Sequence, residues 1–330
     1  MGSSTTVITT ESTPVKEIKP LVMQRLDEPP QEEKYHLVWR NIIVFIYVHL
    51  ATLYGFYLLL TRGNYKVVIF GLIYGFCGGL GITAGAHRLW AHRCYKAKWP
   101  LRLLLGIFQT IAFQNHIYEW SRDHRVHHKF SETDADPHNA KRGFFFSHIG
   151  WLLVRKHPDV RNKGRVVDMS DLDKDFVVVW QKRYYAVLMP LLTFILPTLL
   201  PIYLWGVEPW TAWYITMMRW IIIVNGTWCV NSVAHLWGSK PYDKYINPTE
   251  NLFVSTITAG EGFHNYHHTF PHDYKAGELG NYGFNSTTAF IDLCAYMGWA
   301  YNLKTMPQDI VSRRISRTGD GSHKQNSHYE

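Results

Sequence analysis

Two pairs of long apolar stretches dominate the hydropathy pattern of the chain, and each pair predicts a helical hairpin in a membrane. Residues 41–61, 67–86 and 184–206 contain no Asp, Glu, Lys or Arg. At about 1.5 Å of helical rise per residue, each stretch matches the ~30 Å hydrocarbon core of a bilayer. Residues 211–234 are apolar apart from Arg219, which must face protein or an interface because a charge at mid-depth is costly. We therefore predict four membrane spans.

The polar residues fall on one side of these spans. The turns within each pair hold few basic residues, whereas residues 87–183 and 235–330 hold most of the others. By the positive-inside rule, both long segments and both termini are expected to be cytosolic. The polar composition of residues 1–35 predicts a disordered N-terminal tail, and that of residues 312–330 predicts a flexible basic C-terminal tail. One folded domain is expected between them, over residues 36–311.

The composition excludes several classes of protein. Apolar residues make up 47% of the chain and charged residues 18%, against about 25% charged residues in typical soluble proteins. This balance excludes a disordered chain. The cysteines (Cys77, Cys94, Cys229 and Cys294) are widely spaced, so neither a disulfide framework nor a thiolate zinc site is indicated. A net charge of +8 suits an acidic partner or an anionic membrane face.

Histidine is unusually frequent, with 18 residues, and half of these histidines gather in a few short motifs. Two copies of His-x-x-His-His would each place three imidazoles on one face of a helix. His87 and His92 lie about 140° apart in a regular helix, so either they serve two metals or the helix breaks between them. Imidazole suits iron, copper, zinc and nickel. Two ions with four or five ligands each would account for nine candidate histidines. The candidate ligands are His87, His92, His124, His127, His128, His235, His264, His267 and His268.

Acidic residues near these motifs are candidates to orient the imidazole rings by accepting their second N–H. A single histidine motif would more often be polar surface, but the repeated motifs on one side of the membrane favour metal binding. The other histidines, His138 among them, are expected to be structural or surface groups. The candidate acidic partners are Glu119, Asp123, Asp134, Asp136 and Glu261.

The three histidine motifs resemble the histidine boxes of membrane acyl-CoA desaturases of the stearoyl-CoA desaturase family. The likeness rests on His-Arg-Leu-Trp-Ala-His at 87–92, His-Arg-Val-His-His at 124–128 and His-Asn-Tyr-His-His at 264–268. It extends over residues 39–321. It is greatest toward the insect enzymes, partly because of Arg-Thr-Gly-Asp-Gly at 317–321.

The resemblance implies an all-α integral membrane enzyme of the endoplasmic reticulum, with four transmembrane helices and a cytosolic histidine-rich cap. Two iron ions would be held by the nine histidines, with Asn231 holding a water on one iron. The enzyme would place a cis double bond in a saturated long-chain fatty acyl-CoA, at the delta-9 position by family default, in insect lipid or pheromone biosynthesis. It would use O2 and two electrons from cytochrome b5 with its NADH-dependent reductase, and no nucleic acid is involved.

The same resemblance assigns residues to the substrate. The acyl chain would bend beside Gln114, Trp120 and Thr227. If the second span closes the far end of the acyl tunnel, the small residues Gly75, Gly78 and Gly79 predict a deep pocket that accepts chains of about eighteen carbons or more. The expected contacts of the CoA moiety are Asn41, Asn115, Arg122, Asp123, Arg155, Lys156 and Trp228.

Two alternatives stay open from the residues. A histidine-rich di-iron hydroxylase or sterol oxidase would carry similar motifs. A four-span metal transporter would carry histidines too, but it should place its ligands at mid-membrane in broken helices rather than at one face.

Overall fold

A computed structural model describes the chain except for residues 1–35, 64, 279–281, 283 and 324–330. The predicted N-terminal tail therefore lies outside the described residues. From Leu37 onward the chain forms one compact unit. This unit is mostly helical, as predicted, and a two-residue pairing of β1 (Lys96–Ala97) with β2 (Ala300–Tyr301) forms a small sheet.

Among the described residues, three helical segments are long and apolar enough to cross a membrane, and they coincide with the first three predicted spans. The first is α2, Trp39–Arg62. The second is α3, Tyr65–Leu80, which continues as the π-helix η1, Gly81–Ala91. The third runs through α9, η4 and α10 (Phe176–Pro190, Leu191–Ile195 and Leu196–Trp205), with prolines inside the helix.

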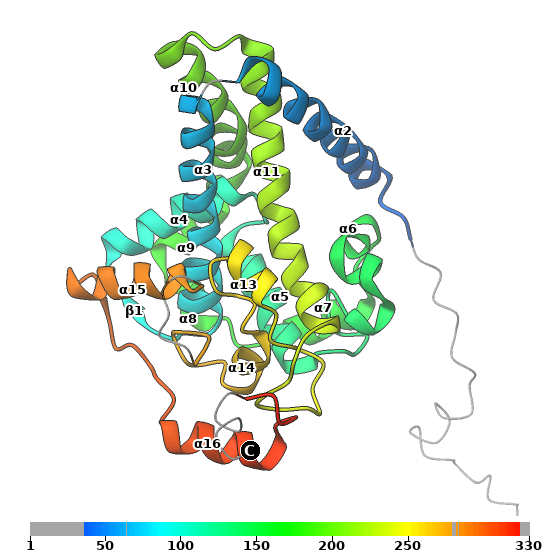
Figure 1. The fold of residues 1–330 in the computed structure, drawn as a ribbon, viewed down its shortest axis with the longest axis vertical. Helices are drawn as coiled ribbons and strands as arrows, with labels where there is room; N and C mark the ends of the chain where they lie inside the picture. The colour runs from blue at the N-terminus through cyan, green and yellow to red at the C-terminus, as the bar shows by residue number, and fades with distance from the viewer. Residues whose placement is uncertain (1–35, 64, 279–281, 283, 324–330) are drawn as a thin grey trace, which may run out of the picture. The chain divides into compact units, whose positions relative to one another are not determined.

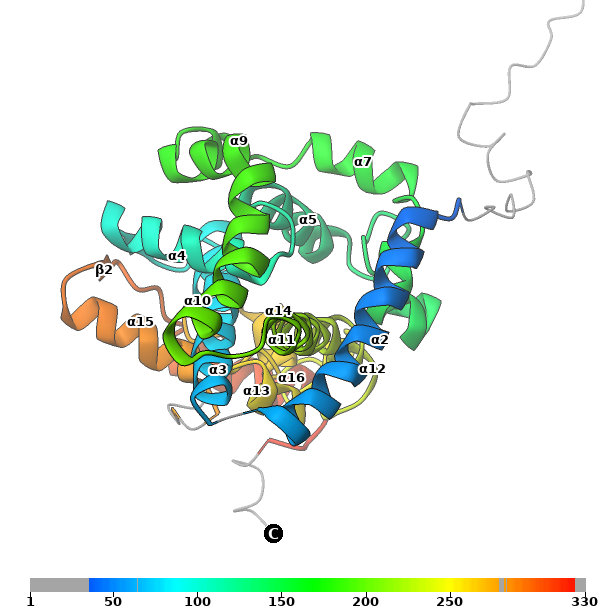
Figure 2. The ribbon, with the colours of Figure 1, turned by 90° about the horizontal axis from the view of Figure 1, so that it is seen from above.

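The predicted fourth span coincides with α11, Pro209–Asn231, which is not among the three apolar candidates. About half of its residues are buried, because it packs against α2, α3 and α10. Figure 2 shows α11 nearly end-on among these helices. A helix surrounded by protein needs less apolar surface than one surrounded by lipid, so its low hydropathy is consistent with its position.

Arg219 in α11 faces protein, which was one of the two predicted ways to accommodate it. Its side chain is 7% exposed. One guanidinium nitrogen, Nη2, donates to the carbonyl oxygen of Thr193 at 2.8 Å, and the group lies over the ring of Tyr74, 5.0 Å from its centroid.

The remaining elements gather around one end of α3 and α11 and form what we call the cap (Figure 1). Its largest apolar cluster joins α4 to the start of α5 through Leu101, Leu105 and Ile117. The cap elements are α4 (Trp99–Ala112), α5 (Ile117–Phe130), η2 (Ala140–Arg142), η3 (Phe146–Gly150), α6 (Trp151–Leu153), α7 (Pro158–Arg165), α8 (Ser170–Asp173), α12 (Val233–Leu236), α13 (Leu252–Ile257), α14 (His264–Thr269), α15 (Ser286–Tyr296) and α16 (Gln308–Thr318).

The start of the predicted C-terminal tail differs from the prediction, because residues 312–318 continue α16. Val311 and Ile315, four residues apart on this helix, are buried against Tyr242 and Tyr266. Apolar residues at this spacing lie on one helix face, and their burial explains why the segment is helical.

Candidate metal centre and substrate cavity

The nine predicted histidines come together from four distant parts of the chain: the end of η1, then α5, α12 and α14. They form two groups, and within each group the candidate ligand nitrogens lie within 4.8 Å of one another. The first histidine group is His87, His92, His124, His128 and His267. The second histidine group is His127, His235, His264 and His268.

The π-helix η1 explains how His87 and His92 reach the same group. The backbone N–H of His92 donates to the carbonyl oxygen of His87 at 3.0 Å, five residues earlier. A π-helical turn closes over five residues rather than four, so it brings these two residues to the same side. The helix therefore departs from regular α-helical geometry between these residues, as one of the two alternatives required, and both histidines belong to the same group.

Each His-x-x-His-His motif divides its imidazoles between the two groups. In α5, His124 and His128 belong to the first histidine group and His127 to the second. In α14, His267 belongs to the first group, whereas its neighbour His268 belongs to the second. The helix faces carrying the motifs thus point at the space between two sites.

Buried carboxylates fix the protonation of three of these rings. The Nδ1 atom of His87 lies 2.7 Å from Glu261, that of His127 lies 2.9 Å from Asp136, and that of His235 lies 2.9 Å from Glu132. Because an ionised carboxylate only accepts, Nδ1 carries the proton and the lone pair is at Nε2.

The Nε2 atoms converge at distances that fit bound metal. In the first group, those of His87 and His267 are 2.9 Å apart. In the second group, those of His235 and His264 are 3.0 Å apart. Imidazole–metal bonds of about 2.0–2.1 Å place neighbouring ligand nitrogens about 3 Å apart, which matches these distances. The donor set therefore fits one cation in each group.

The surroundings keep these imidazoles neutral, which metal ligation requires. Burial, followed by the charges of neighbouring histidines, holds the pKa of most of them well below the usual value. This applies to His92, His124, His128, His264, His267 and His268.

The carboxylates stay ionised beside them. Burial opposes ionisation of Glu261, but His87 and Arg88 outweigh it and lower the pKa of Glu261 to about 2. In the same way, His127 holds the pKa of the buried Asp136 below its usual range.

Two of the five predicted acidic partners, Asp136 and Glu261, contact ligand histidines as expected. Glu132 was missed, because nothing in the sequence indicates that it meets a histidine 103 residues away. The other three predicted acids are engaged elsewhere. Asp123 and Glu119 pair with Lys156, and Asp134 pairs with Arg142.

His138, expected to be a structural or surface group, is buried beside the second histidine group. Its ring lies 4.4 Å from that of His127, centroid to centroid, and its Nδ1 is 3.6 Å from Asp136. With His127 and Asp136 it makes a third set of potential ligand atoms, which shares His127 with the second group.

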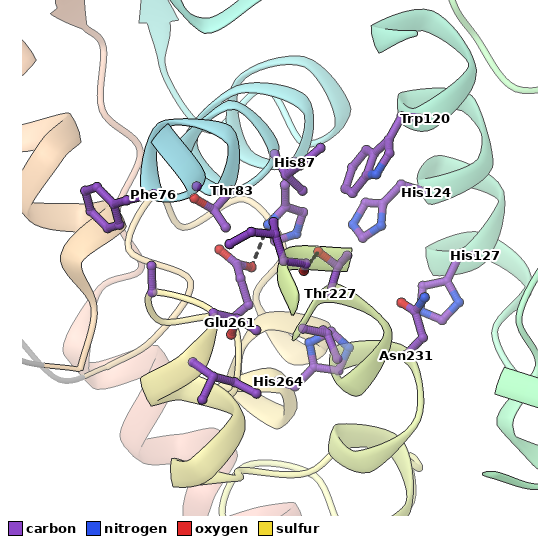
Figure 3. A pocket seen from close by; sticks show the side chains of 18 residues that line it. Phe76, Thr83, His87, Trp120, His124, His127, Thr227, Asn231, Glu261 and His264 are labelled. Carbon is purple, nitrogen blue, oxygen red and sulfur yellow. Dashed lines mark hydrogen bonds and ion pairs between the residues drawn. The ribbon is translucent and has the colours of Figure 1, made fainter. Parts of the chain in front are cut away.

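An apolar cavity opens onto both groups (Figure 3). His87 and His124 of the first group and His127 and His264 of the second line one end of it. The walls continue past Thr83 of η1 to Gly79, Phe76 and Gly75 of α3, opposite residues of α11 and of the segment after α13. A ligand in this cavity would lie against both candidate metal sites. We call it the inner cavity.

A second cavity, the outer cavity, has a volume of about 460 Å³, within the usual range of ligand sites. Two of the residues predicted to contact CoA, Arg122 and Lys156, line a neighbouring cleft, which also includes Asp123. Arg155 is not among the described residues that line this cleft or either cavity. Seven of the ten predicted substrate residues line the outer cavity: Asn41, Gln114, Asn115, Trp120, Asp123, Thr227 and Trp228.

The two cavities meet at a polar junction. Both are lined by Trp120, Thr227 and Asn231. The Gln114 amide nitrogen donates to the Thr227 hydroxyl at 2.9 Å, and the Trp120 indole N–H donates to the Gln114 amide oxygen at 3.4 Å. Residues 113 and 115, on either side of Gln114, both have positive φ angles, of 48° and 67°. Such strained backbone persists where the surroundings hold it, often at functional sites.

Comparisons with known proteins agree with this geometry. Residues 63–276 match the family model described as fatty acid desaturase. The chain is 62% identical to an acyl-CoA Delta-9 desaturase of Acheta domesticus, over 90% of this chain and 83% of the relative. It is 56% identical to an acyl-CoA Delta12-desaturase of the same species (91% and 84%) and 54% identical to an acyl-CoA Delta(11) desaturase of Trichoplusia ni (88% and 83%).

Proposed function

Because the chain belongs to the fatty acid desaturase family, we propose that it places a cis double bond in a saturated long-chain fatty acyl-CoA. Its relatives are named acyl-CoA desaturases, which are oxidoreductases, and the chain is an enzyme of this class. The observation that carries the proposal is the pair of histidine groups at the end of an apolar cavity.

Each histidine group would hold one iron ion, and Asn231, which lines both cavities, would hold a water on one of them. Iron bound there would supply the O2-dependent oxidation of an unactivated methylene pair, which no side-chain acid or base can carry out. The protein's own contribution is to hold the ligand nitrogens in place and to keep the cavity apolar.

The acyl chain would run through the junction into the inner cavity, bending beside Gln114, Trp120 and Thr227. Burying about a dozen methylenes at ~0.8 kcal/mol each would contribute on the order of 10 kcal/mol before ordering costs. This binding energy holds one carbon pair beside the histidine groups and excludes water.

The CoA moiety would lie at the mouth of the outer cavity, near Asn41, Asn115 and Trp228. Its phosphates suit Arg122, Lys156 and Arg155. Lys156 already pairs with the carboxylates of Asp123 and Glu119. A bound phosphate would therefore replace a carboxylate as the anionic partner of Lys156.

We assign the double bond to delta-9, because the Acheta domesticus enzyme of that name shares 62% identity with this chain. The Delta12 and Delta(11) relatives are nearly as similar, so the position needs direct measurement. The test is expression in desaturase-deficient yeast, with products identified by gas chromatography and mass spectrometry. Delta-9 unsaturated fatty acids are expected. Hydroxylated products in place of alkenes would instead indicate a hydroxylase or sterol oxidase.

The enzyme would span the endoplasmic reticulum membrane four times, with α11 as the fourth span and both termini in the cytosol. The chain's net charge of +8 supports an acidic electron donor, which we infer to be cytochrome b5 with its NADH-dependent reductase. Reduction of the enzyme by cytochrome b5 should slow as salt is added, and a rate insensitive to salt would contradict this docking.

A further inference from the structure

Arg88 is a fully buried arginine that the proposed reaction does not yet explain. It follows His87 in η1, and 0% of its side chain is exposed. A buried guanidinium is costly unless hydrogen bonds satisfy it. It donates to the carbonyl oxygens of Tyr274 (3.0 Å) and Lys275 (3.1 Å), the Thr288 hydroxyl (3.0 Å), the Glu261 carboxylate (2.9 Å) and the Asn285 amide oxygen (3.3 Å).

The contact with Glu261 links Arg88 to the first histidine group. One oxygen of Glu261 accepts from Arg88 at 2.9 Å, and the other lies 2.7 Å from Nδ1 of His87. Glu261 is therefore held from both sides, and its orientation sets that of the His87 ring. Partners of this kind fix the tautomer and orientation of ligand histidines.

The second histidine group is oriented by different residues. Its His127 is held by Asp136, and its His235 by Glu132. Both carboxylates come from the segment after α5, whereas the residues bonded to Arg88 lie between 261 and 288. Arg88 therefore contacts the carboxylate that orients a ligand of the first group and neither of the carboxylates that orient His127 and His235 of the second.

We propose that Arg88 is a positioning residue for the first histidine group: it holds Glu261, which holds His87, and it anchors both to the segment leading into α15. This inference rests on the proposed two-metal centre. Without the guanidinium, Glu261 loses the partner that fixes it, and the His87 ring is no longer directed at the first site. His127 and His235 of the second site keep their own carboxylates.

The test is the metal content of the purified full-length protein. Arg88→Gln should reduce bound iron from two ions per chain to one. The matched control is Arg102→Gln, because Arg102 also pairs with a buried carboxylate, that of Asp175 at 3.0 Å. In both arginines the Nε atom has no hydrogen-bond partner among the described residues. The control should keep two ions, even if its melting temperature falls. Two ions in folded Arg88→Gln would overturn the proposal.

Double variants identify which ion is lost. Arg88→Gln combined with His92→Ala, both acting on the first group, should still bind one ion. Arg88→Gln combined with His235→Ala should bind none. The reverse pattern would contradict the assignment of Arg88 to the first group.

A milder variant covers the case in which Arg88→Gln does not fold. Thr288→Val removes one hydrogen-bond partner of Arg88 and keeps the side-chain shape. One of the two ions should then leave several-fold faster when a chelator is added, and the other at the rate seen in the unmodified chain. If both ions leave Thr288→Val at the rates seen in the unmodified chain, the proposal is also overturned. An unmodified chain that binds no metal would instead refute the proposed centre itself.

Discussion

At the scale of single residues, the buried carboxylates decide which nitrogen of an imidazole can bind metal. Asp136 accepts from His127 and Glu261 accepts from His87, so the lone pairs of both rings are at Nε2. The sequence indicated that these two acids could serve as partners, because each lies a few residues from a histidine motif. It could not indicate Glu132, whose contact with His235 exists only once distant segments have packed.

Removing one ligand from either group should abolish the reaction, because both sites are needed. His127→Ala affects the second histidine group and His267→Ala the first. Each variant is expected to eliminate unsaturated fatty acids in desaturase-deficient yeast, measured by gas chromatography. His36→Ala, at an exposed position, is the control and should keep full output. Unchanged output from either ligand variant would be incompatible with the proposed centre.

At the scale of elements, hydropathy predicted the helices well, but it could not predict a π-helix. Reasoning at 100° per residue placed His87 and His92 apart, and η1 brings them together. The start of η1 packs closely against α4. A side chain at Gly81, where η1 begins, would lie 2.1 Å from the backbone nitrogen of Gln109 in α4, so this close approach requires glycine. Such a contact is invisible to periodicity.

The small residues of α3 should set the length of the accepted acyl chain. Gly75 and Gly79 line the inner cavity, whereas Gly78 is not among its described lining residues and instead packs against Ile111 of α4. No described atom lies within 4 Å of a Cβ at Gly79, whereas a Cβ at Gly75 would meet Ile223 at 3.2 Å. Gly79→Tyr should therefore fill the cavity with little strain, and Gly75→Tyr should fill it with more.

We expect both variants to lose products of eighteen carbons selectively and to keep shorter ones, measured as the fatty acid profile of expressing yeast. Gly71→Tyr is the matched control, because Gly71 lies on the same helix but is not among the described residues that line the inner cavity. A chain-length profile unchanged in Gly79→Tyr would refute the view that this cavity holds the end of the chain.

At the scale of the whole molecule, two predictions from the sequence were confirmed: the nine histidines gather at one end of the long helices, and three of those helices are apolar enough to span a membrane. Which histidines form the group of five and which form the group of four could not be predicted. That division depends on how η1, α5, α12 and α14 pack together, and a motif records only spacing within one element. The fourth span is likewise a question of packing, because α11 is enclosed by other helices.

The number of spans determines where the C-terminus lies. If α11 crosses the membrane, the C-terminus is cytosolic, and a glycosylation acceptor site appended there should stay unmodified in microsomes. The same site inserted at residue 207, in the turn between α10 and α11, should be glycosylated. Glycosylation of the C-terminal site would mean that α11 does not cross, and the four-span topology would be wrong.

The most direct test of the account is Mössbauer spectroscopy of purified, active protein loaded with ⁵⁷Fe, combined with its iron content. Two groups of imidazoles, five in one and four in the other, predict two iron ions per chain in distinguishable nitrogen-rich environments. A single iron site in fully active enzyme would contradict the central claim that both histidine groups together form the catalytic centre.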